Sequence, residues 1–127
     1  MAEIYKTRII SQGAEADTFL AGGMAITFGS GAPDTLAQYC FILAPAKLAA
    51  QVRPGQLLRV GERAYPITAV GEVASRNLSE LGHVTLNFDG ADSPQLDGTI
   101  HIRVDGPVPD MRPGVDFSIE DSSEEGK

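Results

Sequence analysis

Short runs of alternating apolar and polar residues, separated by glycine and proline, recur along the whole chain and constrain its fold most strongly. In residues 83–88, Val84, Leu86 and Phe88 fall on one face, and residues 99–104 repeat the pattern. Such alternation is typical of strands with one buried face. The 127 residues include 14 glycines and eight prolines, which mark many turns. The sequence therefore predicts an all-β fold rather than a helical bundle.

The expected elements are short and closely spaced. The strands predicted by the pattern are residues 4–10, 24–28, 39–43, 57–60, 64–70, 83–88, 99–104 and 115–119. Helical turns are predicted at residues 14–20, 46–52 and 75–81, with Gly82 as the C-terminal cap of the last. Short strands and tight turns favour a small closed or nearly closed β-barrel with short helical turns, or else a sandwich. Closure would also remove the sheet edges.

Two segments of the chain have similar sequences, which suggests an internal repeat. Residues 53–60 and 112–119 both begin with Arg-Pro-Gly and continue as an alternating strand. Proline followed by glycine suits the central positions of a type II turn. The similarity has two interpretations: independent use of the same turn chemistry, or two similar halves that build one barrel.

Length, charge and composition limit the domain organisation, the partners and the cellular location that we expect for this chain. We expect one domain at residues 1–119, followed by a disordered acidic tail at residues 120–127, which carries four acids and no apolar residue. The net charge of −7 and the scattered cations make nucleic acid an improbable partner. No signal peptide is expected, and no apolar run approaches the roughly 20 residues of a membrane helix. The single cysteine, Cys40, fits a reducing cytoplasm.

Several motifs together resemble one protein family. They are residues 31–33, 39–42, 65–71, 80–90 and 106–109. As a set they resemble the glucitol/sorbitol-specific IIA component of the bacterial phosphoenolpyruvate-dependent sugar phosphotransferase system (PTS), and the resemblance runs from Ile4 to about Ile119. It implies a cytoplasmic, mostly β protein that needs no cofactor. Such a protein accepts a phosphoryl group from HPr and passes it to the IIB/IIC permease of a sugar alcohol.

The resemblance also places the family's phosphohistidine at Leu43 of this chain. A second histidine, expected two residues later, is replaced by Pro45. Because leucine has no lone pair, it cannot accept a phosphoryl group, and whether the chain is an enzyme stays open. Either another residue carries the phosphate, or the chain is a non-catalytic binding or regulatory module derived from the family. The module would bind a permease domain, a regulator or a small sugar alcohol.

His83 is the candidate catalytic residue. Alternation places it on the outward face of its strand, opposite Val84 and Leu86. It is interpreted as a structural histidine bonded across strands, as a residue that supports the former phosphorylation site, or as the acceptor itself. The other histidine, His101, is expected to face solvent beside Arg103.

Cys40 raises a third hypothesis, a cysteine-dependent enzyme, which would need a reactive thiol. Its apolar neighbours in residues 39–43 instead predict a small buried side chain. Two histidines and one cysteine on separate strands match no standard zinc spacing, so no metal site is predicted.

Overall fold

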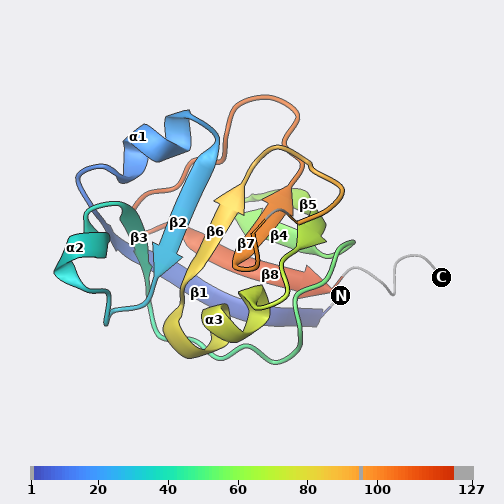
Figure 1. Cartoon of the computed structure of the whole chain (residues 1–127), viewed down its shortest axis with the longest axis horizontal. Helices are drawn as coiled ribbons and strands as arrows, with labels where there is room; N and C mark the ends of the chain where they lie inside the picture. Colours follow the sequence, from blue (N-terminus) through green and yellow to red (C-terminus); the bar gives the residue numbers. More distant parts are fainter. Residues whose placement is uncertain (1, 95, 122–127) are drawn as a thin grey trace.

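The alternating segments close into a ring of strands (Figure 1). The computed structural model describes residues 2–94 and 96–121. Its strands are β1 (Ala2–Gln12), β2 (Met24–Phe28), β3 (Cys40–Leu43), β4 (Leu57–Val60), β5 (Arg63–Val70), β6 (Val84–Asn87), β7 (Thr99–Ile102) and β8 (Asp116–Asp121). Its helices are α1 (Ala16–Ala21), α2 (Asp34–Ala37) and α3 (Ala74–Leu81). The predicted closed barrel is confirmed, with the strand order β1-β3-β2-β6-β7-β5-β4-β8.

The core fills the barrel as the alternation predicted. On β6, Val84 and Leu86 are buried, whereas Thr85 and Asn87 between them are partly exposed. Other large side chains sealed inside include Phe41, Leu58, Ile67, Ile100, Ile102, Met111, Phe117 and Ile119. Burial of these apolar surfaces is the main force that holds a closed barrel of this kind together.

The two halves of the chain are arranged alike around the ring. The strands β1 to β4 correspond to β5 to β8, and exchanging the two sets reproduces the same ring in reverse order. The parallel β2–β3 pair, which aligns Ile26 with Cys40, matches the parallel β6–β7 pair, which aligns Thr85 with Thr99. Each residue of the second pair lies 59 positions after its counterpart. These pairings support the interpretation that two similar halves build the barrel.

The two Arg-Pro-Gly turns also match in detail. Gly55 and Gly114 have φ of 96° and 93°, the left-handed conformation that a type II turn requires at its third position. The Gly55 N–H donates to the Ile67 carbonyl at 2.8 Å, and the Gly114 N–H donates to the Ile9 carbonyl at 2.7 Å. Each turn therefore ties the start of one strand to the middle of a neighbouring strand.

The solvent exposure predicted for His101 is wrong. All four residues of β7 are buried, and His101 has 0% exposure. Its Nδ1 lies 2.8 Å from Asp89 Oδ1, and the Thr68 hydroxyl donates to the Ala91 carbonyl at 2.7 Å. The segment after β6 thus lies over the outer face of β7 and removes His101 from solvent.

Two helical predictions also need correction. Residues 46–52 form no helix, because their backbone is bonded to distant elements: the Ala49 N–H donates to the Ile4 carbonyl and the Val52 N–H to the Ser75 hydroxyl. The sequence pattern did not predict α2, which begins after Pro33. Among the described residues, every helix is too short or too polar to cross a lipid bilayer.

The predicted domain boundary at residue 119 lies inside a strand. β8 continues to Asp121, and Glu120 is buried beside Arg59 of β4, whose Nε donates to its carboxylate at 2.9 Å. This ion pair and the β1 and β4 ladders hold residues 120 and 121 in the sheet. The rest of the predicted tail, residues 122–127, lies outside the described residues.

Candidate functional site

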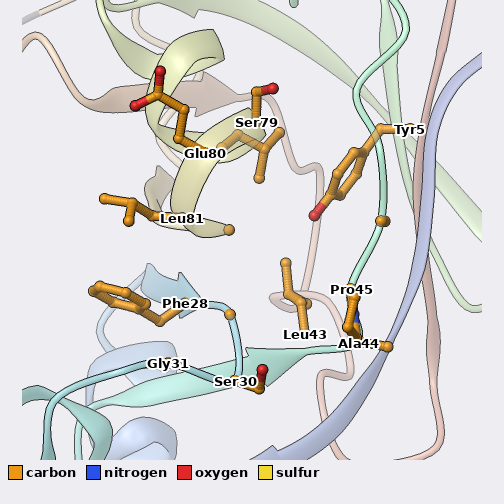
Figure 2. A pocket seen from close by; sticks show the side chains of 14 residues that line it. Tyr5, Phe28, Ser30, Gly31, Leu43, Ala44, Pro45, Ser79, Glu80 and Leu81 are labelled. Carbon is orange, nitrogen blue, oxygen red and sulfur yellow. The ribbon is translucent and has the colours of Figure 1, made fainter.

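Leu43 lies at the end of β3 beside a cavity of about 280 Å³ (Figure 2). Its side chain is 1% exposed and belongs to the hydrophobic core. Three other parts of the chain complete the lining: Tyr5 of β1, the end of β2 with the loop at residues 28–31, and the end of α3 at residues 78–82. The cavity therefore forms only when the barrel is closed.

Two glycines allow β2 and α3 to meet at this cavity. The Gly29 N–H donates to the Leu81 carbonyl at 2.8 Å. A Cβ on Gly29 would lie 2.8 Å from the same carbonyl oxygen, and a Cβ on Gly82 would lie 2.8 Å from the Gly29 nitrogen. Gly82 has φ of 68° and caps α3, as predicted from the sequence. Larger residues at either position would push the two walls of the cavity apart.

The side chains that line the Leu43 cavity can form hydrogen bonds, but they provide no strong nucleophile. Its polar side chains are Tyr5, Ser30, Ser79 and Glu80, and its apolar walls include Phe28 and Leu43. Among the described residues of the lining there is no histidine, cysteine, lysine or arginine. Burial raises the pKa of Tyr5 to about 12, so its phenol is neutral near pH 7.

The buried phenol predicts a loss of stability at alkaline pH. Below pH 10, the ordinary pKa of a tyrosine side chain, both folded and unfolded chains keep the Tyr5 proton. As the pH rises from 10 toward 12, the unfolded chain ionises first, so the free energy of unfolding falls by about 2–3 kcal/mol. Denaturant unfolding at about pH 9 and about pH 11 measures the first half of this fall, about 1.4 kcal/mol. A Tyr5→Phe variant is expected to lose less stability over that interval, and an equal loss in both proteins would contradict the prediction.

His83 lies next to this cavity but does not line it. It follows the Gly82 cap, and its ring centroid is 4.5 Å from that of Phe28, which does line the cavity. Its Nδ1 is 3.2 Å from the Thr27 carbonyl oxygen. An N–H at Nδ1 that donates to this carbonyl leaves a lone pair on Nε2. His83 therefore contacts a residue that lines the Leu43 cavity, whereas His83 itself lines a different hollow.

The hollow that His83 lines is almost wholly apolar. Its other walls are Phe19, Ile26, Leu36, Tyr39, Cys40 and Thr85. The rings of Phe19 and Tyr39 stack with centroids 5.5 Å apart, and they join α1 to the start of β3. Because the described residues that line it include no lysine or arginine, this hollow offers a negatively charged phosphoryl group little stabilisation.

Cys40 is confirmed as a small buried side chain. It is free and buried, and its Sγ lies 3.2 Å from the Leu36 carbonyl oxygen. Burial raises the pKa of its thiol, so little reactive thiolate forms near neutral pH. These features disfavour the cysteine-dependent enzyme. Within residues 2–94 and 96–121, no three His, Cys, Asp or Glu side chains are grouped so that they could hold a metal ion.

The sequence pattern alone did not point to Tyr5, Ser30 or Ser79. Tyr5 reads as an ordinary core residue of the first strand, and the serines read as solvated positions in a loop and on a helix. The signals that did point to this region were the resemblance at position 43 and the glycine cap at position 82.

Comparison with known proteins agrees with the resemblance over nearly the full length. The family model described as "PTS system glucitol/sorbitol-specific IIA component" matches residues 4–118. Two relatives named "PTS system glucitol/sorbitol-specific EIIA component", from Shigella flexneri and Escherichia coli (strain K12), are each 46% identical over 125 residues, which is 98% of this chain and 100% of each relative.

A solved structure shares the fold. The crystal structure of a PTS system IIA component from Enterococcus faecalis V583 matches with a TM-score of 0.74 and 26% identity, over 91% of this chain and 98% of that one. The fold, the family match and the full-length relatives agree, and this chain belongs to the family of glucitol/sorbitol-specific IIA components of the PTS.

Proposed function

We propose that this chain occupies the IIA position of a sugar-alcohol PTS in the cytoplasm, where it contacts HPr and the IIB/IIC permease. The observation that carries this proposal is the family match over residues 4–118 together with the names of the full-length relatives. The closed barrel and the solved IIA structure that it resembles add support.

Within that position, Leu43 occupies the place of the family's phosphohistidine, and the chain docks without carrying a phosphoryl group there. Phosphoryl transfer needs a nucleophile and donors for the phosphoryl oxygens. The described lining around Leu43 offers no imidazole and no cation, while the Glu80 carboxylate and the C-terminal end of α3 add negative potential. The geometry therefore favours the non-catalytic binding or regulatory module over a carrier.

A second candidate is a carrier that uses His83. The observation in its favour is the contact of Nδ1 with the Thr27 carbonyl, which fixes the tautomer and leaves Nε2 as a lone-pair donor. The apolar walls around His83 count against it.

A reconstituted phosphorylation assay tests both versions. The full chain is incubated with phosphoenolpyruvate, enzyme I and HPr beside an authentic IIA protein, and intact mass is recorded. We expect the authentic protein to gain a phosphoryl group and this chain to stay unlabelled, because Leu43 has no lone pair. Titration of isotope-labelled HPr by NMR, in parallel, is expected to show saturable binding of the unchanged protein.

The outcomes separate the alternatives. An acid-labile phosphate on this chain that disappears in a His83→Ala variant would establish the second candidate instead. If neither HPr nor a IIB domain bound the folded protein, the IIA position itself would be wrong. A thiol-linked phosphate would instead point to Cys40 and overturn both.

A further inference from the structure

The Leu43 cavity has a counterpart in the second half of the barrel. The Ala44 N–H donates to the Arg8 carbonyl at 2.9 Å, and the Arg103 N–H donates to the Pro66 carbonyl at 2.9 Å. Arg103 lies 59 positions after Ala44, and Pro66 lies 58 positions after Arg8. The pairing of β1 with β3 and that of β5 with β7 follow the same two offsets. The segment after β7 therefore corresponds to the segment after β3.

This correspondence places charged side chains where the first half has neutral ones. The residues of the second half that correspond to Tyr5, Ala44 and Ala46 of the cavity lining are Arg63, Arg103 and Asp105. Together with Ala64 and Tyr65 they line a separate hollow of about 290 Å³, which we name the Arg103 hollow. The two halves thus share an architecture at this place but differ in its charge.

The Arg103 hollow carries an excess of positive charge. Arg63 and Arg103 are exposed, and within residues 2–94 and 96–121 neither side chain forms an ion pair or a hydrogen bond. Asp105 sets one carboxylate against two guanidinium groups, so one net positive charge remains on a chain whose net charge is −7. A concave site with a local positive charge attracts anions.

The backbone supports the cationic side chains of this hollow. Arg63 and Tyr65 are two residues apart on β5, so they lie on the same face of that strand. The stem of Arg103 lies against Gly90: a Cβ on Gly90 would lie 3.5 Å from the Arg103 Cβ and 3.7 Å from its Cγ. The Gly90 N–H donates to the Ile102 carbonyl at 2.9 Å, which holds the two segments together. A supported stem reduces the entropy that the arginine loses when it binds.

We propose that the Arg103 hollow binds a dianionic phosphate group, as inorganic phosphate or as the phosphate monoester of a small metabolite. Each guanidinium can donate two parallel hydrogen bonds to a phosphoryl group, and the Tyr65 phenol adds a neutral donor for another oxygen. Two cations match the charge of the dianion, whereas a carboxylate brings one charge and two oxygens. The site is separate from the Leu43 cavity and does not depend on the proposed PTS position.

Titration of the isotope-labelled full chain with inorganic phosphate, followed by NMR at constant ionic strength, tests this proposal. The amide signals of Tyr65 and Arg103 are expected to shift saturably, in the millimolar range because the site is exposed. Arg63→Gln and Arg103→Gln are each expected to weaken binding about threefold, and the double variant about tenfold. The matched control is Arg76→Gln, which removes an exposed arginine of α3 outside the hollow and is expected to leave the affinity unchanged.

A variant with the opposite sign strengthens the test. Asp105→Asn removes the carboxylate of the hollow and is expected to tighten phosphate binding about twofold. The substituted positions are all exposed, so the unfolding midpoints are expected to stay unchanged. Absence of a saturable shift in the unchanged protein, or equal weakening by Arg76→Gln and Arg103→Gln, would overturn the proposal. Acetate that bound as tightly as phosphate would show a carboxylate site and overturn the phosphate assignment.

Discussion

The Leu43→His variant is expected to accept a phosphoryl group from phosphorylated HPr, whereas the unchanged protein stays unlabelled. An imidazole at the end of β3 would enter the cavity beside the Tyr5 hydroxyl, which can hold one ring nitrogen. With an ordinary pKa of about 6.5, most of the ring is a neutral nucleophile near pH 7. The labelled fraction, read by intact mass in the presence of enzyme I and HPr, is expected to rise from undetectable to most of the protein.

The controls for this variant separate chemistry from folding. Leu43→Asn places a polar but non-nucleophilic side chain at the same site and is expected to remain unlabelled. Either change places polar atoms in a core position that is 1% exposed, so each is expected to cost about 1–3 kcal/mol of stability. A folded Leu43→His protein that binds HPr but takes no phosphate would contradict the assignment of position 43.

The second large effect concerns the backbone: Gly71→Ala is expected to lower the free energy of unfolding by about 3 kcal/mol or more. A Cβ on Gly71 would lie 2.2 Å from the Asp97 carbonyl oxygen, far inside van der Waals contact. The Gly71 N–H also donates to the Thr99 carbonyl at 2.8 Å, which fixes the end of β5 against the start of β7. Neither strand can withdraw without breaking its ladder. Denaturant unfolding measures the loss.

Gly31→Ala is the matched control for this prediction. A Cβ on Gly31 meets no heavy atom within 4 Å, and its φ lies outside the left-handed region, so its effect is expected to stay within about 0.5 kcal/mol. Gly13→Ala, whose Cβ would lie 2.2 Å from the Ala37 carbonyl oxygen, is expected to match Gly71→Ala. Equal stability of the Gly31→Ala and Gly71→Ala proteins would show that the backbone relaxes freely at this point.

The strands were predictable because their pattern is local. Burial on one face of a strand imposes a period of two, and the bounds of β2 and β4 agree with the predicted residues 24–28 and 57–60. The failures depend on distant contacts. The helical pattern of residues 46–52 is overridden by bonds to β1 and α3, and His101 is covered by a segment that its own alternation cannot reveal.

The candidate site was predictable only at the positions that the family resemblance marks. The resemblance placed Leu43 and His83 in the candidate site, but it did not predict that Phe28 contacts His83 and also lines the Leu43 cavity. Tyr5 lies far from Leu43 in the chain and reaches the cavity because β1 pairs with β3. The contact of Tyr5 and Leu43 with one cavity depends on how the strands pair in the closed barrel, and a local sequence pattern does not predict that pairing.

The same strand neighbours could be kept by a chain that connects the strands of the closed barrel in a different order. β8 and β1 are neighbours that hold the two ends of the described chain side by side, with Ala2 opposite Asp121. In the matching half, β4 and β5 are neighbours joined by the tight turn after Val60. A circular permutant that joins β8 to β1 and opens the chain at that turn would keep every strand partner. The barrel is thus defined by which strands are neighbours. The chain could be opened either between β8 and β1 or at the turn between β4 and β5 without changing those neighbours.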